Sequence, residues 1–187
     1  MMQKTMQLTK KILRYFFLPL LVLMLAWIGY FKIYGNFHQV DTNLYRSAQL
    51  YNFNLPHYIQ KYNIKSVINL RGSSKDAQWY QDEIHIAKKY DITHYDFGLP
   101  DRRVIPLEKM DTLVALMRQA PKPLLIHCKA GADRTSLASA LYLYAIQKDR
   151  NAQNAISITY GHFPWLGSKT KAMDISFQNY QNNRIVQ

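Results

Sequence analysis

A cysteine and an arginine in one short loop are the residues of this sequence best suited to chemistry. The loop reads His127-Cys128-Lys129-Ala130-Gly131-Ala132-Asp133-Arg134-Thr135. It follows a continuously apolar stretch, residues 123–126, and precedes an apolar helical pattern over 135–147. A loop that enters a helix points its backbone N–H groups at one spot, where the helix dipole adds positive potential. The pattern therefore predicts an anion-binding cradle from Lys129 to Arg134.

The side chains around this cradle have separate expected roles. The positive field favours the thiolate form of Cys128, which makes it a nucleophile at neutral pH. Arg134 can place its planar guanidinium on two phosphate oxygens, and Gly131 permits the tight backbone path. We expect Thr135 to donate its hydroxyl to the sulfur and help it leave in a second step. His127 is expected to brace the loop by hydrogen bonds, because a thiolate needs no base.

Five loop positions are expected to bind the anionic part of a substrate: Lys129, Ala130, Gly131, Ala132 and Asp133. The charged side chains of Lys129 and Asp133 allow two interpretations, as groups that tune the substrate or as solvated loop charges. Both interpretations stay open at this point.

The elements that must position this loop follow from length and periodicity. A chain of 187 residues with 48% hydrophobic residues is long enough for one folded domain. Strands are predicted over 43–47, 66–70, 92–99 and 123–127, and helices over 55–62, 76–90, 106–120, 135–147, 152–160 and 172–183. Strands that alternate with helices indicate an α/β sheet covered on both faces.

The N-terminal segment differs from the rest of the chain. Residues Tyr15 to Phe31 carry no charge, have aromatic residues at both ends and would form a helix about 25 Å long. This pattern predicts a transmembrane segment within residues 1–32, followed by a single domain over 33–187. More basic residues precede the segment than follow it, so the N-terminus is expected in the cytoplasm and the domain in the periplasm. No A-x-A pattern follows, which favours an uncleaved inner-membrane anchor over a cleaved signal peptide.

Charge and ligand patterns exclude several functions. The net charge is +12, from 24 basic and 12 acidic residues, but five of the bases lie in residues 1–32. The rest are dispersed without a nucleic-acid recognition motif, so no nucleic-acid partner is expected. The six histidines are scattered and the one cysteine cannot form a thiolate zinc site. We therefore expect no metal and no cofactor.

The signature HCKAGADRT resembles that of the cysteine-dependent protein tyrosine and dual-specificity phosphatases, whose pattern is His-Cys-x5-Arg-Thr. The segments LYRSAQL and SVINLRG occur in the order that this resemblance implies, over residues 38–165. The chain is most similar to the compact bacterial type that is exported or membrane-tethered. It departs from many members at Ser136, where they have Gly. The resemblance implies a mixed, mostly parallel sheet of about four to five strands flanked by helices.

The same resemblance implies a general acid on a loop upstream of the signature. Two aspartates qualify, Asp96 within the predicted strand and Asp101 in the loop from Pro100 to Pro106. We favour Asp101, because a loop can move and a strand holds its side chains still. Cys128 would then attack phosphorus, Arg134 and the loop amides would bind the developing charge, and a cysteinyl-phosphate would form.

These residues lead us to expect a protein phosphatase that acts on phosphotyrosine, and also on phosphoserine or phosphothreonine if its pocket is shallow. The alternative is a phosphatase of phospholipids or phosphoinositides at the membrane surface, which the basic surface and Lys129-Ala130-Gly131 favour. The expected partner is thus a phosphoprotein or a phospholipid headgroup. A third hypothesis is a protein that binds phosphate without turning it over.

Overall fold

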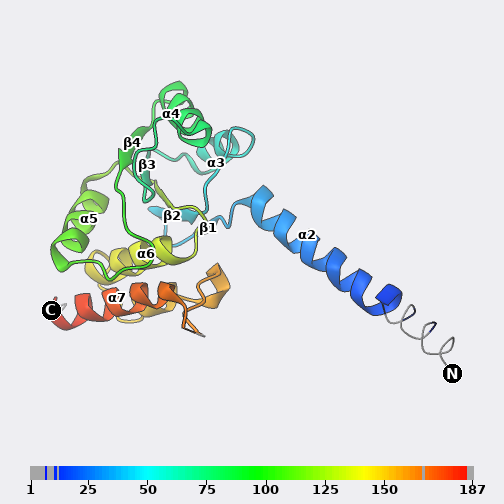
Figure 1. The fold of residues 1–187 in the computed structure, drawn as a ribbon. Helices are drawn as coiled ribbons and strands as arrows, with labels where there is room; N and C mark the ends of the chain where they lie inside the picture. The colour runs from blue at the N-terminus through cyan, green and yellow to red at the C-terminus, as the bar shows by residue number, and fades with distance from the viewer. Residues whose placement is uncertain (1–6, 8–10, 12, 166, 185–187) are drawn as a thin grey trace. The chain divides into compact units, whose positions relative to one another are not determined.

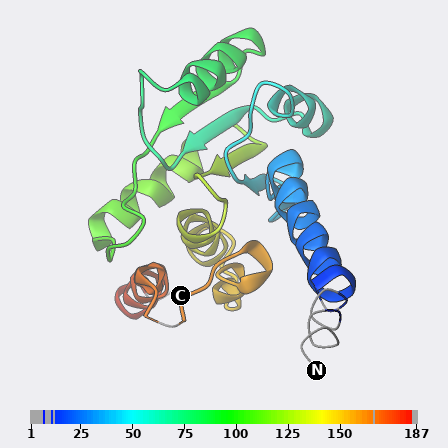
Figure 2. The same cartoon turned by 45° about the vertical axis from the view of Figure 1, so that its right-hand side comes forward.

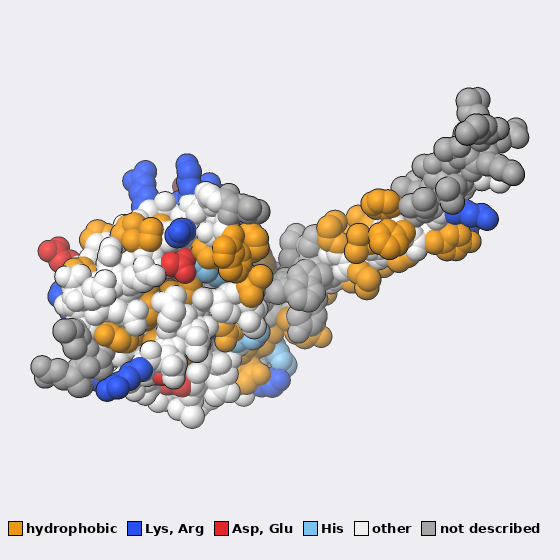
Figure 3. Space-filling view, turned by 90° about the horizontal axis from the view of Figure 1, so that it is seen from below, with side chains coloured by type: hydrophobic (Ala, Val, Ile, Leu, Met, Phe, Trp, Pro, Cys, Tyr) orange, Lys and Arg blue, Asp and Glu red, His pale blue; other side chains and the backbone are white. Residues whose placement is uncertain are grey.

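The computed structural model describes the whole chain except residues 1–6, 8–10, 12, 166 and 185–187 (Figure 1). It divides the chain into two compact units, Met1–Tyr34 and Gly35–Gln187, which we describe separately. In the first unit a short π-helix, Leu13–Phe17, leads into the helix α2, Leu18–Tyr34. Apolar side chains such as Leu20, Val22 and Leu23 are exposed along it (Figure 3).

The structure does not support the predicted transmembrane helix. The stretch expected to cross the membrane, residues 15–31, is divided between the π-helix and α2, and α2 itself has 17 residues. Within the described part of the chain, no helix has both the length and the apolarity that crossing a membrane requires. Lys4 and Lys10, which belong to the expected cytoplasmic stub, lie outside the described residues.

The second unit is built on a five-stranded sheet with the order β1-β2-β5-β3-β4. The strands are β1 (His38–Gln39), β2 (Leu44–Ser47), β3 (Ser66–Asn69), β4 (Thr93–Asp96) and β5 (Leu124–His127). The pair β1 and β2 is antiparallel, and every other neighbouring pair is parallel. The predicted α/β class and the mixed, mostly parallel sheet are therefore confirmed.

Helices cover both faces of this sheet (Figures 1 and 2). They are α3 (Leu55–Tyr62) and α4 (Gln78–Lys89) on one face and α5 (Leu107–Gln119) and α6 (Asp133–Ala145) on the other. The helix α7 (Ala172–Asn183) packs against α5 and α6 rather than on the sheet. Successive side chains of β5 point to opposite faces. Leu124 and Ile126 pack with the core of α5, α6 and α7, whereas Leu125 packs with the core of α3 and α4. Leu125 is 1% exposed, so the strand that precedes the signature is buried from both sides.

The strand register brings the residues of the site to one edge of the sheet. Ser47 and Asn69 are both paired with His127, and Asn69 is also paired with Asp96. The carboxyl ends of four strands are thus aligned, and the loops that follow them meet there. In open α/β sheets this is the edge where ligands bind.

Three local differences separate the structure from the predicted elements. Strand β4 ends at Asp96 rather than at residue 99, because the chain leaves the sheet and Leu99 N bonds instead to Leu70 O at 3.1 Å. The two-residue strand β1 was not predicted, since two residues are too few to show a period. The region 152–160 forms the short 3₁₀ helices Ala152–Ala155 and Ile158–Tyr160 in place of one helix.

Candidate active site

The signature loop lies between the end of β5 and the start of α6, where the sequence places it. Cys128 follows the last residue of β5 directly and is 3% exposed. The helix α6 begins at Asp133, and its residues from Thr135 to Tyr142 are all buried. The loop therefore joins two rigid elements and is fixed at both ends.

Hydrogen bonds from a segment near the start of the second unit set the direction of three successive peptide groups in this loop. The donor and acceptor pairs are Gln49 N to Lys129 O at 3.3 Å, Asn36 Nδ2 to Ala130 O at 3.2 Å, and Arg46 Nη2 to Gly131 O at 2.9 Å. In a trans peptide the N–H points opposite to the carbonyl. The N–H groups of Ala130, Gly131 and Ala132 consequently point away from these donors. This geometry supplies the donors of the predicted anion cradle.

Arg46 is a buried cation beneath the loop that sequence reasoning missed. Its side chain is 1% exposed and also donates to Ser136 Oγ at 2.7 Å and to Ala155 O at 3.0 Å. Its guanidinium lies 3.9 Å from the centre of the Tyr160 ring. Burial lowers the pKa of Arg46 to about 10, against the opposing effects of Tyr160 and Cys128, so the group stays charged at neutral pH. Ser136, the position at which the sequence departs from the expected signature, is thus a partner of this cation.

Glycine is required at position 131 for two reasons. Its φ is +69°, a backbone conformation that other residues rarely adopt. A Cβ at this position would lie 2.5 Å from Ala48 N and 2.7 Å from Ser47 C. Any side chain here would push the signature loop away from the end of β2.

Arg134 lies between the two loops that flank the cradle. Its Nη1 donates to Leu70 O at 3.2 Å and to Leu99 O at 3.3 Å, the carbonyls that follow β3 and β4. These bonds use one nitrogen of the fork and fix the direction of the guanidinium. The remaining N–H groups can bind phosphate oxygens.

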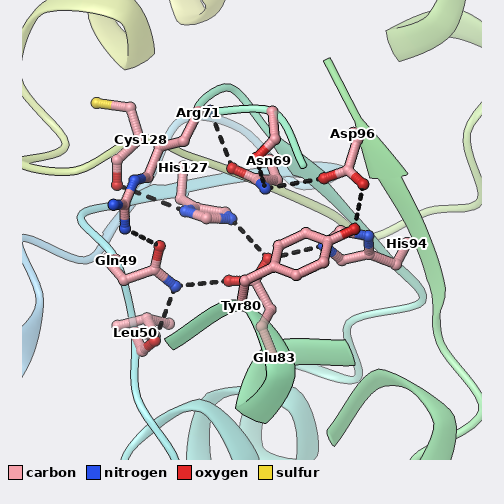
Figure 4. A network of polar contacts seen from close by, with 11 residues as sticks. Gln49, Leu50, Asn69, Arg71, Tyr80, Glu83, His94, Asp96, His127 and Cys128 are labelled. Carbon is pink, nitrogen blue, oxygen red and sulfur yellow. Dashed lines mark hydrogen bonds and ion pairs between the residues drawn. The ribbon is translucent and has the colours of Figure 1, made fainter. Parts of the chain in front are cut away.

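His127 belongs to a buried polar network centred on Glu83 (Figure 4). Its Nε2 lies 3.1 Å from Glu83 Oε1, and its Nδ1 lies 3.4 Å from Cys128 O. His94 Nε2 lies 2.7 Å from the same Glu83 oxygen, and Gln49 Nε2 donates to the other oxygen at 2.6 Å. Burial acts to raise the pKa of Glu83, but the charges and hydrogen bonds of His127 and His94 outweigh it and hold that pKa well below its usual range. His127 is therefore anchored within the core.

The two candidate general acids have different surroundings. Asp96 accepts hydrogen bonds from Asn69 Nδ2 at 2.9 Å and from the Tyr80 hydroxyl, which hold it at the end of β4. The bond to Asp96 raises the pKa of Tyr80. Asp101 is exposed, and no hydrogen bond or ion pair joins it to another described residue. It lines a cavity of about 430 Å³ together with basic side chains and a proline: Pro100, Arg102, Arg103 and Lys169.

Three other predicted site residues, Thr135, Asp133 and Lys129, differ in the contacts that their side chains make. The hydroxyl of Thr135 is buried and has no hydrogen-bond partner among the described residues, so the expected bond to sulfur is not formed. The carboxylate of Asp133 lies 2.7 Å from His162 Nδ1, whose Nε2 lies 2.9 Å from Asp174 Oδ2. Asp133 thus ties the loop to α7. Lys129 is exposed.

Burial acts to lower the pKa of His162, but its hydrogen bonds to Asp133 and Asp174 outweigh this effect and raise it. This histidine is 1% exposed. Sequence reasoning missed it, as it missed Asn36, Gln49 and Glu83. All four act through contacts between residues far apart in the chain, and a single sequence gives no signal for such contacts. Among the described residues no group of His, Cys, Asp or Glu is arranged to hold a metal ion.

A family model described as "DSP-PTPase phosphatase fused to NAD+ Kinase" matches residues 36–178, which include the whole site. A comparison with curated protein sequences finds no match.

Solved structures of phosphatases share the fold. TpbA of P. aeruginosa is 21% identical, with a TM-score of 0.55 over 78% of this chain and 84% of TpbA. PTPMT1 is 17% identical, with a TM-score of 0.58 over 79% of this chain and 97% of PTPMT1. Tk-PTP is 15% identical, with a TM-score of 0.59 over 78% of this chain and 97% of Tk-PTP. TpbA has also been solved in complex with pTyr and PTPMT1 in complex with PI(5)P.

Proposed function

The chain belongs to the DSP-PTPase family and is a phosphatase of that type, and we propose that it hydrolyses phosphotyrosine monoesters in proteins. The observation that carries this proposal is the preset cradle. Three carbonyls are held on the core side of the loop, which leaves the amides of Ala130, Gly131 and Ala132 for a phosphate next to Cys128. The complex of TpbA with pTyr supports the choice of substrate class.

In the proposed reaction the Cys128 thiolate attacks phosphorus and forms an S–P bond as the ester P–O bond breaks. The loop amides and Arg134 bind the charge that develops on the phosphoryl oxygens. Asp101 gives its proton to the leaving phenolate oxygen, because an unprotonated phenolate is a poor leaving group. Water then attacks phosphorus, its proton passes to the Asp101 carboxylate, and the S–P bond breaks to release phosphate and the thiolate.

The hydroxyl of Thr135, which has no hydrogen-bond partner in the described part of the chain, fits a role in the second step. It would donate a hydrogen bond to the sulfur as the thiolate re-forms, and so stabilise the leaving charge. A buried hydroxyl without a partner costs free energy in the resting protein, and that cost is relieved when the bond to sulfur forms.

A second candidate function is hydrolysis of a phosphoinositide. PTPMT1, which shares the fold, has been solved in complex with PI(5)P. In this chain the cavity beside Asp101 is lined by the bases Arg102, Arg103 and Lys169, which would attract a headgroup with several negative charges.

The test is phosphate release by the full-length chain in detergent under reducing conditions. The substrates are a phosphotyrosine peptide, the matched phosphothreonine peptide and PI(5)P in mixed micelles, and Cys128→Ser is the control. We expect turnover of the phosphotyrosine peptide that is lost in Cys128→Ser. Turnover of PI(5)P alone would replace the proposal by the second candidate, and no turnover of any substrate would contradict both.

For localisation we propose attachment of the N-terminal unit to the inner membrane, with residues 35–187 in the periplasm. The sequence supports the proposal through the uncharged stretch from Tyr15 to Phe31 and the excess of basic residues before it. The apolar side chains described along α2 are exposed, as contact with lipid would require. A periplasmic reporter fused after Gln187 should be active. Activity of a cytoplasmic reporter alone would contradict the proposal.

A further inference from the structure

Arg71 lies beside the cradle but has no part in the reaction as described above. It follows Leu70, whose carbonyl accepts a hydrogen bond from Arg134 Nη1 at 3.2 Å. Its own backbone N–H donates to Asn69 Oδ1 at 2.9 Å, which fixes the turn after β3. Arg71 is therefore one residue away from the contact that positions the phosphate-binding arginine.

The guanidinium of Arg71 is held in place from two directions. Its Nη1 donates to Gln49 Oε1 at 2.8 Å, and its Cζ lies 3.4 Å from the centre of the Trp79 ring. The backbone of Gln49 in turn bonds to Lys129 O in the signature loop. Figure 4 shows Arg71 with Gln49 and Cys128 in this network. A guanidinium that is already fixed loses little conformational entropy when it binds an anion.

The charge of Arg71 is not neutralised by a carboxylate. None of the ion pairs between described residues involves it. The negative charge of Glu83 attracts Arg71 electrostatically. Both carboxylate oxygens of Glu83, however, already accept hydrogen bonds from Gln49, His127 and His94. Burial and the positive charge of Arg134 lower the pKa of Arg71, against Tyr51, Glu83 and Cys128, which raise it. Arg71 is thus close enough to Arg134 and Cys128 to interact electrostatically with both, and among the described residues only its Nη1 donates a side-chain hydrogen bond.

We propose that Arg71 forms a second anion-binding subsite beside the cradle, which takes the carboxylate of an acidic residue next to the phosphotyrosine. The inference rests on the proposed function, since it adds a preference among phosphotyrosine substrates. Arg134 would bind the phosphate, and the free N–H groups of Arg71 would bind the carboxylate as a charge-assisted pair.

A peptide fits this subsite better than a polyphosphorylated headgroup. One guanidinium provides charge for one carboxylate. The basic neighbour of Arg71 is Arg134, which the phosphate would occupy, and the side chains that flank the guanidinium itself are aromatic. Trp79 covers one face of Arg71, and Tyr51, which interacts electrostatically with Arg71, is 42% exposed and lies beside the exposed Phe53 with ring centres 5.9 Å apart. Such an apolar and cationic surface matches a peptide with mixed side chains.

The experiment compares kcat/KM of the full-length chain for two phosphotyrosine peptides that differ only in having Glu or Gln on both sides of the phosphotyrosine. We expect the wild type to prefer the Glu peptide by about tenfold at low salt and less at high salt. In Arg71→Met the preference should fall below about twofold, while turnover of the Gln peptide changes by less than about threefold. Arg150→Met, which removes an exposed arginine after α6, should keep the wild-type preference.

Two further results separate this inference from the function on which it rests. Arg71→Lys keeps the charge and should retain part of the preference, and thermal unfolding shows that each variant is folded. Equal turnover of the two peptides by the wild type, or an unchanged preference in a folded Arg71→Met, would overturn the subsite alone. No turnover of either peptide by the wild type would overturn the proposed function as well. A different result would overturn the assignment to a peptide carboxylate. In that result the wild type shows no preference between the two peptides but prefers a bisphosphorylated to a monophosphorylated inositol lipid, and Arg71→Met abolishes the lipid preference.

Discussion

The two sides of the site around Arg134 differ in how firmly the fold holds them. On the side of the signature loop, carbonyls and side chains are bound by buried partners such as Arg46 and Glu83, both at most 2% exposed. On the side of the loop after β4, Asp101 is exposed and makes no hydrogen bond to another described residue. The half of the site that we propose to bind phosphate is thus preorganised, whereas the side chain of the candidate acid has no hydrogen bond to another described residue. Preorganised donors stabilise developing charge without reorganisation, and an acid needs only to reach the leaving oxygen.

The largest effect is expected on the preorganised side. Arg134→Lys removes the planar fork while it keeps the charge, and we expect kcat/KM for a phosphotyrosine peptide to fall by about 10³. The measurement is steady-state kinetics of the full-length variant beside Arg150→Lys, which should match the wild type. A loss of less than about fivefold in Arg134→Lys would show that phosphate binding does not depend on this fork.

The acid side should show a smaller effect that depends on the substrate. Asp101→Asn should lower kcat/KM for a phosphotyrosine peptide by about 10², and by much less for an aryl phosphate whose phenol is strongly acidic. The reason is that kcat/KM reports the steps up to S–P bond formation, in which such a leaving group needs no proton. Asp96→Asn can still accept a hydrogen bond from Asn69 Nδ2 and can donate one to the Tyr80 hydroxyl oxygen, and it should lower kcat/KM by less than about fivefold. The opposite ranking of the two variants would assign the acid to Asp96.

Loss of the buried cation should weaken the cradle without removing the nucleophile. Arg46→Met leaves Gly131 O, Ala155 O and Ser136 Oγ without their donor. We expect the affinity for orthovanadate, a phosphate mimic, to fall by about tenfold, with a lower Tm. Ser136→Ala, which removes one acceptor of Arg46, should lower the Tm without changing vanadate affinity more than about twofold. Wild-type vanadate affinity in a folded Arg46→Met would show that the loop keeps its direction without this cation.

The smallest predicted effect is a pH dependence of thermal stability. It comes from the ion pairs of His162 with Asp133 and Asp174, which connect the signature loop to α7. The pKa of His162 is raised by Asp133 and Asp174 against the effect of burial, so it lies above its unfolded value of about 6.5. The stabilisation that protonated His162 gives the folded protein is fully present below the unfolded pKa and is lost as the pH rises through the folded pKa. Between pH 6 and pH 9 the Tm of the wild type should therefore decrease more than the Tm of His162→Gln, and the two decreases should differ by about 2–4 °C. His57→Gln, at an exposed site, should follow the wild type, and identical curves for wild type and His162→Gln would contradict the assignment.

The parts of this molecule that were predictable are those encoded locally. The apolar stretch 123–126, the loop with Gly131 and the helix after it lie within one short segment, and their order alone indicates a strand, an anion cradle and a buried helix. The α/β class and the parallel strand pairs follow from the same alternation.

The supports of the cradle could not be predicted, because each is a contact across the fold. Arg46 looks like an ordinary strand residue, and only the pairing of β2 with β5 places it under Gly131, 85 positions away. The role of Glu83 could not be predicted for the same reason, since its partner His127 is 44 positions away in the sequence. The length of β4 was overestimated because Phe97 and Leu99 continue the apolar alternation after the chain has left the sheet.

The central claim is that phosphate passes through Cys128, and the most direct measurement is to trap the intermediate. The full-length chain is mixed with a ³²P-labelled phosphotyrosine peptide, quenched in acid within milliseconds to seconds and digested for mapping. We expect radiolabel on the peptide that contains Cys128, and none in Cys128→Ser. Release of phosphate by the wild type without any labelled intermediate, together with wild-type turnover in Cys128→Ser, would contradict the claim.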